Sequence, residues 1–318
     1  MKWAILGVGD VARRRVAGAI HEDPGSELVG ACRRNRKELE AFAAEFRVPR
    51  AYDEEALYSD ADVDAVYIAT PPSDHEAQTI AAARAGKHVL VEKPMALTEA
   101  QCRAMVDACR EHGVTLGVAY YRRFYPVWSR LRDLVRNGTL GEPLSIRCAT
   151  SSNFGLRPSE EGFWRVQPDR SGGGALMDVG SHRLDLFLDL FGDPADVFGQ
   201  CDTIAGAFDG DDCSTVTLRF PSGVHGSLQC FFGGAADPDE LGVIGTRGSA
   251  FVRPLNGGEL LLDVDGTRSV EQHSPAKNFN TPLIEDFRRA VEEGREPTVT
   301  GIDGQRVQGV IDRAYGRR

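Results

Sequence analysis

No stretch of this 318-residue sequence approaches the ~20 consecutive apolar residues that a membrane-spanning helix needs. Positive charge is also scarce, because 37 Lys and Arg residues stand against 47 Asp and Glu residues. The resulting net charge of -10 argues against nucleic acid or an anionic membrane surface as the main partner. The seven cysteines show no CxxC spacing, which predicts reduced core thiols in place of disulfides or a zinc site. Glycine interrupts the N-terminal apolar segment too early for a signal peptide, so we expect a cytoplasmic protein.

The first 120 residues alternate apolar, strand-like runs with amphipathic, helix-like stretches. We predict strands at 3–9, 26–32, 63–70, 88–92 and 114–119, and helices at 11–23, 36–46, 75–86 and 98–113. Regular alternation with short loops is typical of a parallel sheet with helices on both faces. Residues 1–120 are therefore predicted to form an α/β Rossmann domain with a doubly wound parallel sheet.

Residues 121–318 have a different pattern. A helix at 126–138 and a strand at 143–152 precede a glycine-rich segment, and turn signals such as "PSG", "NGG" and "VDGT" then separate further β-like runs. These runs lie at 214–220, 223–232, 240–246, 249–254, 259–264 and 267–272. We predict an α+β domain with a large, mostly antiparallel open sheet. The C-terminal helix is a candidate to pack back on the first domain.

The segment "ILGVGDVA" follows the first predicted strand and opens the first predicted helix. Gly7, Gly9 and Ala12 match the G-x-G-x-x-A form of the dinucleotide fingerprint, with Asp10 and Val11 between them. Gly7 permits a tight turn, Gly9 allows the backbone to approach a pyrophosphate, and the helix N-terminus supplies amide donors. A βα turn without a ligand is the alternative, and the surrounding βαβ pattern favours the cofactor site.

The end of the second predicted strand lacks the usual acid that binds the adenosine ribose. Cys32 stands there, and Arg33 and Arg34 follow. A solvated basic helix start explains Arg36 and Lys37 better than it explains the first two arginines. We therefore expect Arg33 and Arg34 to favour a 2'-phosphate, and hence NADP over NAD.

Two further groups of polar residues are candidates for ligand binding or catalysis. Lys93 follows Glu92 at the mouth of the buried run "HVLV", where open α/β sheets bind ligands, although a surface ion pair would also explain the two charges. In "GGGALMDVGSHRLDLF", Asp178 and His182 are four residues apart and share one helix face, with Asp185 one turn further. They need a ligand or a buried partner, and a satisfied Asp-His pair is the alternative. A metal site would need at least one further ligand at a suitable spacing, and the sequence shows none, so we predict no metal.

The segments "AILGVGDVA", "VYIATPPSDHEAQTIAAARAGKHVLVEKPMALT" and "SGGGALMDVGSH" together resemble the Gfo/Idh/MocA oxidoreductases, the family of glucose-fructose oxidoreductase and inositol 2-dehydrogenase. The resemblance covers nearly the whole chain. It implies that Lys93 lies beside the nicotinamide and takes part in proton transfer, and that Glu92 orients this loop or contacts the cofactor. A cis bond before Pro94 is a further implication. Asp178 and His182 would bind substrate hydroxyls, with His182 a candidate acid or base.

The same resemblance implies roles for other residues. Thr70, Pro71 and His75 would line the cofactor crevice, although His75 could also be a surface histidine at a helix N-terminus. Tyr121 is the best match for another substrate contact and Arg123 the second, with packing at a domain hinge as the alternative. In "FWRVQPDRSGGG", Trp164 and Arg165 are weaker cofactor candidates.

These observations predict an enzyme that transfers a hydride between NADP, or NAD, and a secondary alcohol or ketone of a sugar, polyol or cyclic derivative. The resemblance also implies that residues 121–318 bind the substrate and form a homodimer or homotetramer through the open sheet. Two alternatives come from other classes: an NAD-dependent glycosidase that oxidises its substrate transiently, and a non-catalytic regulator that binds the cofactor. The presence of Lys93, Asp178 and His182 argues against the regulator.

Overall fold

The computed structural model describes residues 1–234 and 238–317. The chain divides into two compact units, each built from two stretches of sequence. Unit 1 consists of Met1–Tyr121 and Ala276–Gln305, and unit 2 consists of Arg122–Pro275 and Arg306–Arg318. No helix in the described part of the chain is both long enough and apolar enough to cross a membrane.

Unit 1 contains a six-stranded sheet with the order β3-β2-β1-β4-β5-β6, in which every pairing is parallel. The prediction of a doubly wound parallel sheet is therefore confirmed. The strands are β1 (Lys2–Leu6), β2 (Glu27–Cys32), β3 (Arg50–Tyr52), β4 (Ala65–Ile68), β5 (His88–Val91) and β6 (Leu116–Val118). The helices between them are η1 (Ala12–Val16), α1 (Ala17–Glu22), α2 (Arg36–Phe46), α3 (Glu54–Ser59), α4 (Pro72–Arg84) and α5 (Glu99–Glu111). Strand β3 and helix α3 were not predicted from the sequence.

The strand order reverses between β1 and β4, which makes this pair the topological switch point of the sheet. In open α/β sheets, ligands bind outside the carboxyl ends of the strands at this point. Backbone hydrogen bonds continue past the strand ends, from Ala69 N to Leu6 O (2.8 Å) and from Glu92 N to Ile68 O (2.8 Å). The turns after β1, β4 and β5 therefore lie side by side along one edge.

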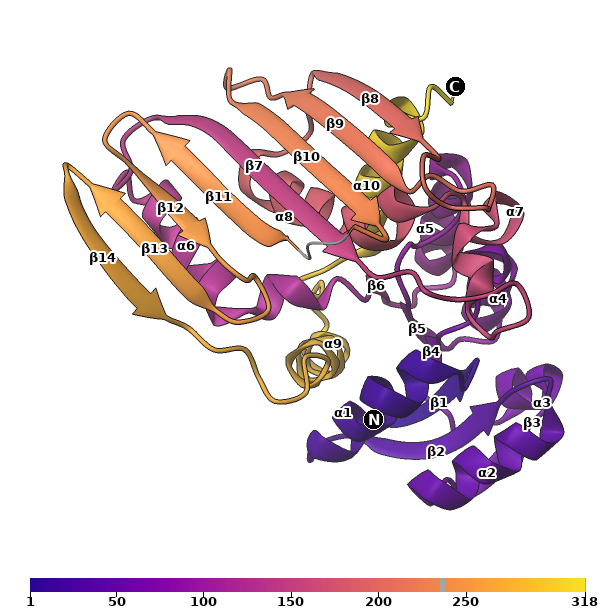
Figure 1. The fold of residues 1–318 in the computed structure, drawn as a ribbon. Helices are drawn as coiled ribbons and strands as arrows, with labels where there is room; N and C mark the ends of the chain where they lie inside the picture. Colours follow the sequence, from indigo (N-terminus) through magenta and orange to yellow (C-terminus); the bar gives the residue numbers. More distant parts are fainter. Residues whose placement is uncertain (235–237, 318) are drawn as a thin grey trace. The chain divides into compact units, whose positions relative to one another are not determined.

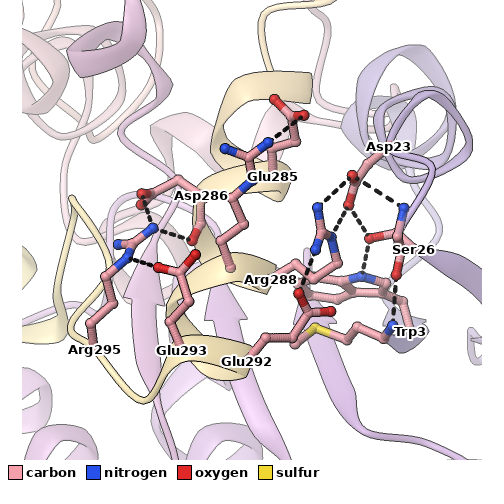
Figure 2. Close-up of polar contacts among 12 residues, drawn as sticks. Trp3, Asp23, Ser26, Glu285, Asp286, Arg288, Glu292, Glu293 and Arg295 are labelled. Carbon is pink, nitrogen blue, oxygen red and sulfur yellow. Dashed lines mark hydrogen bonds and ion pairs between the residues drawn. The ribbon is translucent and has the colours of Figure 1, made fainter.

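Helix α9 (Thr281–Glu293) belongs to unit 1 although it comes late in the sequence. Figure 2 shows Arg288 of α9 beside Asp23, with bonds of 2.7 Å and 3.1 Å from its guanidinium to the two carboxylate oxygens. Phe287 packs on Trp3 with ring centroids 5.5 Å apart, and the Trp3 indole donates to Ser26 (3.0 Å). Apolar packing and a paired carboxylate thus attach α9 to the first strand and helix.

Unit 2 is built on an eight-stranded sheet with the order β14-β13-β12-β11-β7-β10-β9-β8 (Figure 1). Every pairing is antiparallel except that of β7 with β10, which confirms the prediction of a mostly antiparallel sheet. The strands are β7 (Pro143–Ser152), β8 (Asp196–Asp202), β9 (Cys213–Arg219), β10 (His225–Phe232), β11 (Asp239–Gly245), β12 (Gly248–Val252), β13 (Glu259–Val264) and β14 (Thr267–Gln272). Edge strand β8 was not predicted.

The helical elements of unit 2 include η2 (Tyr121–Phe124, which starts at the last residue of unit 1), α6 (Pro126–Arg136), η3 (Phe163–Val166), α7 (Pro168–Ser171), η4 (Leu176–Gly180) and α8 (Ser181–Phe191). Helix α10 (Gly301–Ala314) contains the boundary at which the chain returns from unit 1 to unit 2. Segment η4 packs on β7 and β10, whose inward residues Ile146, Cys148 and Leu228 are buried. The segment with Asp178 and His182 therefore lies directly against the sheet.

Candidate active site

The turn after β1 has the backbone geometry that the glycine fingerprint predicts. Gly7 has φ +95°, and a Cβ there would lie 2.8 Å from the backbone of Ala69 and Thr70. The Gly7 amide donates to Cys32 O (2.9 Å) and the Gly9 amide donates to Gly7 O (2.9 Å). Only glycine fits at this position, because both the positive φ and the close neighbouring turn exclude a side chain.

The first helix contains a π turn that the sequence did not predict. Asp10 and Val11 are already α-helical, Ala12–Val16 forms the π-helical segment, and α1 follows from Ala17. Ala12 is completely buried, as close helix–sheet packing requires, whereas Asp10 is exposed and pairs with Arg14 (2.7 Å). Val11 is half-buried just before this segment. Single π turns inside helices are frequent at functional sites.

The two arginines after β2 differ in their surroundings. Arg33 donates to Val8 O inside the glycine turn (2.8 Å) and pairs with Glu38, and its side chain is 19% exposed. The Arg34 side chain is 88% exposed and reaches Asp74 at 3.3 Å. Burial raises the pKa of the Cys32 thiol to about 11, with a smaller contribution from the charges of Glu54 and Asp53, so Cys32 carries no charge at neutral pH. Arg33 thus supports the glycine turn, whereas Arg34 is exposed to solvent apart from its contact with Asp74.

Glu92 and Lys93 follow β5 on the same edge as the glycine turn. Glu92 is buried, and its carboxylate accepts hydrogen bonds from the Tyr67 hydroxyl (2.7 Å) and the Lys93 amide (3.2 Å). Burial raises the pKa of Glu92, and the nearby charge of Lys93 opposes that shift. The peptide bond between Lys93 and Pro94 is cis, as the resemblance implies. Because Glu92 is buried and held in this way, the alternative of a surface ion pair is wrong.

His75 connects the turn after β4 to the turn after β5. Its side chain is completely buried, so the alternative of a surface histidine is wrong. Its Nε2 lies 2.8 Å from Thr70 O, and its Nδ1 lies 3.1 Å from the carbonyl oxygens of both Pro94 and Met95. Burial lowers the pKa of His75, and these carbonyl contacts oppose the shift. Pro71 caps α4 beside it, and the Thr70 hydroxyl contacts Gln78 Oε1 (2.6 Å).

Tyr121 is buried in an aromatic cluster of unit 1. Its hydroxyl accepts a hydrogen bond from Arg15 (2.8 Å), and its ring stacks on Phe279 at 6.0 Å between centroids and 12° between planes. The Arg15 guanidinium carbon lies 5.2 Å from the Tyr121 ring centroid. Asn280, next to Phe279, donates to the Tyr67 hydroxyl (3.3 Å) that binds Glu92.

Four further residues contribute to this edge without having been predicted, namely Arg15, Tyr67, Phe279 and Asn280. Phe279 and Asn280 come more than 150 residues after the other members, and no local pattern marks them. Tyr67 lies inside the buried strand β4, where a tyrosine hydroxyl needs a partner, but the sequence does not show that this partner is Glu92.

In unit 2, Asp178 lies in the π-helical segment Leu176–Gly180 and His182 lies in the first turn of α8. The helix is therefore not a regular α-helix at this point, and the shared face of Asp178 and His182 stays a prediction. Asp178 is half-buried and His182 is buried. Asp185, also on α8, is completely buried in a different contact.

That contact is a buried ion pair with Arg123. The Arg123 guanidinium lies 2.7 Å from Asp185 Oδ1, and its Nε donates to both carboxylate oxygens at 3.0 Å. The side chains are 5% and 0% exposed, respectively. Bidentate pairing of this kind holds Arg123 on α8, which limits its availability as a substrate contact.

Trp164 and Arg165 lie in η3 of unit 2 and contact each other. The Arg165 guanidinium carbon is 4.8 Å from the Trp164 ring centroid, and both residues are half-buried. Their assignment to the cofactor stays a prediction.

Comparisons with known proteins agree with this geometry. Residues 1–120 match the model of the "Oxidoreductase family, NAD-binding Rossmann fold", and residues 128–251 match the "GFO/IDH/MocA C-terminal domain". The chain is 33% identical over 311 residues to a 1,5-anhydro-D-fructose reductase of Ensifer adhaerens, covering 95% of this chain and 92% of the relative. It is 32% identical to D-xylose 1-dehydrogenase (NADP(+)) 2 of Haloferax volcanii, covering 99% and 96% of the two chains.

A solved structure shows the same architecture. The aldose-aldose oxidoreductase from Caulobacter crescentus, complexed with glycerol, superimposes with a TM-score of 0.91 at 29% identity, covering 99% of this chain and 96% of that one. The two family models match in the expected order, and one relative is matched over almost its full length. The glycine turn also lies at the switch point of the sheet. The chain belongs to the Gfo/Idh/MocA family of NAD(P)-dependent oxidoreductases.

Proposed function

We propose that this protein interconverts a secondary alcohol and a ketone on a sugar or polyol, with NADP as the preferred cofactor. One observation carries the proposal: the glycine turn and Lys93 lie on the same carboxyl edge, on either side of the turn after β4. When bound, the nicotinamide supplies or accepts the hydride. The names of the relatives, a reductase of an anhydrosugar and a xylose dehydrogenase, support sugars as the substrate class.

Each candidate residue has a role in this proposal. Lys93, with His182, exchanges a proton with the reacting oxygen, and Asp178 and Tyr121 hold neighbouring hydroxyls. Glu92 fixes the start of the Lys93 loop through the Lys93 amide. Residues 1–120 would serve the cofactor and residues 121–318 the substrate.

The test is a screen of sugars, polyols and keto-sugars with NADP(H) and NAD(H), followed at the nicotinamide absorbance. Turnover of a pyranose or its keto derivative supports the proposal. Absence of turnover across the screen, by a protein that binds the cofactor tightly, would contradict it.

Cofactor choice depends on the two arginines after β2, and the structure separates their effects. Arg34→Ala should lower the NADP preference by about tenfold, because one hydrogen bond between charged groups contributes roughly 1.5–3 kcal/mol. Arg33→Ala should weaken binding of both cofactors, because Arg33 supports the glycine turn through Val8 O. Values of kcat/KM with NADP and NAD for the wild type and both variants decide the matter. A wild type that prefers NAD, or an Arg34→Ala variant with unchanged selectivity, would refute the phosphate role.

We also propose a homo-oligomer formed through the open face of the unit 2 sheet. Strand register aligns one row of residues across this face, namely Phe198, Thr217, Ser227, Arg147, Gly242, Phe251, Leu261 and Val270. Phe198 and Val270, near its two ends, are each 64% exposed. The Phe251 ring lies over Gly242 and is flanked by Arg147 and Arg253, whose guanidinium carbons are 4.6 Å and 5.3 Å from its centroid. Exposed apolar groups in such a row are typical of an interface.

Light scattering at micromolar concentration should therefore show a dimer or tetramer. Val270→Asp should reduce the mass, because it places a charge in the proposed interface. Ile204→Asp is the matched control, since Ile204 is 73% exposed but lies outside the strands of the sheet. A monomeric wild type would refute the proposal.

A further inference from the structure

We infer that Asp211, together with Tyr315, is a positioning residue that sets the start of the helix carrying Asp178 and His182. The inference rests on the proposed function, because it concerns the proposed substrate residues. Asp211 itself is buried and lies outside every motif that the sequence analysis singled out.

The Asp211 carboxylate is fully engaged by donors from three separate parts of unit 2. Oδ1 accepts from the Gly174 amide (2.7 Å) and the Tyr315 hydroxyl (2.5 Å), and Oδ2 accepts from the Leu176 amide (2.8 Å) and the Ser214 hydroxyl (2.6 Å). The Asp211 carbonyl also accepts from the Ala175 amide (2.7 Å). Three consecutive amides of the glycine-rich segment therefore bind one residue.

These amides belong to the first turn of the helical segment. Amides at a helix N-terminus lack intrahelical partners, and a carboxylate there satisfies them and interacts favourably with the helix dipole. Side-chain caps usually come from the preceding residue, whereas here the cap comes from 37 residues further along the chain. The start of this helix is thus attached to β9, because Asp211 lies two residues before Cys213, the first residue of that strand.

The glycine tract makes this contact possible. A Cβ at Gly174 would overlap the backbone of Asp211, and a Cβ at Gly173 would overlap the Tyr315 hydroxyl. Arg317, whose guanidinium carbon lies 4.4 Å from the Tyr315 ring centroid, donates to Gly172 O (2.5 Å). The close approach of Asp211 and Tyr315 accounts for consecutive glycines at this place.

The contact between Asp211 and Gly174 lies only a few residues before the proposed substrate residues in the sequence. The Asp178 amide donates to Gly174 O (2.9 Å), so the residue that Asp211 holds is itself a hydrogen-bond partner of Asp178. The π segment then leads directly to His182. A displacement at Gly174 is expected to move Asp178 first and His182 next, and misplacement of such groups by about 1 Å can cost 10²-fold in rate.

The chain offers a matched control in the next residue. Asp212 is also buried, and its carboxylate accepts from the amides of Ile204, Ala205 and Gly206 (2.8, 2.8 and 2.6 Å). These three amides belong to residues 204–206 and not to the glycine tract. Asp212→Asn therefore removes a similar buried carboxylate whose amide donors lie outside the start of the helix.

The experiment compares Asp211→Asn, Tyr315→Phe and Asp212→Asn in the full-length enzyme. Asp211→Asn should lower kcat/KM for the sugar by about tenfold to a hundredfold with the cofactor Kd unchanged, and should speed amide exchange in residues 174–182. Tyr315→Phe should act in the same direction with a smaller effect. Asp211→Asn and Asp212→Asn should lower the Tm by similar amounts, because each removes a buried carboxylate. Asp212→Asn should nevertheless leave kcat/KM and amide exchange in residues 174–182 unchanged.

Each outcome has a defined consequence. Unchanged amide exchange in Asp211→Asn overturns the inference whatever the activity. Faster exchange with unchanged kcat/KM, or equal losses of kcat/KM in Asp211→Asn and Asp212→Asn, overturns the positioning role. A wild type that turns over none of the screened sugars refutes the proposed function instead, and the exchange data then decide alone whether Asp211 holds the helix.

Discussion

Replacement of Lys93 by methionine is expected to lower kcat by about 10²–10⁴-fold while the cofactor Kd stays nearly unchanged. General acid-base groups typically contribute this range in rate, and methionine keeps the length and apolar stem of lysine without its exchangeable proton. The fold of the turn should survive, because the Glu92 carboxylate and the His75 ring still accept or make their hydrogen bonds with its backbone in the variant. Steady-state kinetics and cofactor titration by fluorescence measure the two quantities.

Variants of the two proposed substrate-binding residues provide the comparison with Lys93→Met. Asp178→Ala and His182→Ala should also lower kcat/KM without changing the cofactor Kd, but their KM for the sugar should rise, whereas that of Lys93→Met should change little. A Lys93→Met enzyme with wild-type kcat would remove Lys93 from the proton transfer. A variant of Asp178 or His182 that mainly raised the cofactor Kd would show that the assigned roles are wrong.

Replacement of Arg123 by methionine should lower the free energy of unfolding by about 3–5 kcal/mol. The variant would leave the Asp185 carboxylate buried without its main counter-charge, and breaking a buried pair on one side typically costs this much. Chemical denaturation of the wild type and the variant gives the difference. The folded Arg123→Met variant should keep the wild-type KM for the sugar, because the structure places Arg123 against α8.

An exposed pair offers the control for this experiment. Arg103 and Glu99 lie four residues apart on α5 with side chains 62% and 39% exposed, and Arg103→Met should leave the unfolding free energy nearly unchanged. If Arg123→Met were instead as stable as the wild type but had a much higher substrate KM, the substrate contact expected from the sequence would be correct.

Much of the fold was predictable because its signals are local. The run from Leu6 through Gly7 to Ala12 contains a strand end, a glycine turn and a helix start in adjacent residues. Strands such as β7 and β13 match the predicted ranges because turn residues delimit them on both sides. Strand β3 has only three residues, and β8 has no fully buried face, so neither shows the hydrophobic pattern that identifies a strand.

The site was predictable only where a residue ends a strand or belongs to a motif. Lys93 and Gly7 meet this condition. The partners of Glu92 and Gly174, Tyr67 and Asp211, do not, because they lie 25 and 37 residues away along the chain. Asn280, which donates to the Tyr67 hydroxyl, lies 213 residues from it. The pairing of Arg123 with Asp185 spans 62 residues, and nothing local to Arg123 distinguishes a buried ion pair from a substrate contact. Long-range pairing of polar groups is therefore the information that a single sequence lacks.

The division of unit 1 into two stretches has a consequence for synthesis on the ribosome. Domains usually fold as soon as their sequence has emerged, at ~5–20 residues per second of translation. Unit 1 cannot do so here, because Ala276–Gln305 emerges only after all of Arg122–Pro275 has been translated. Until then Trp3, completely buried in the finished protein, lacks Phe287, and the Asp23 carboxylate lacks Arg288. The nascent chain thus carries an incomplete nucleotide-binding fold through most of its translation, and this is the period in which we expect it to depend most on chaperones.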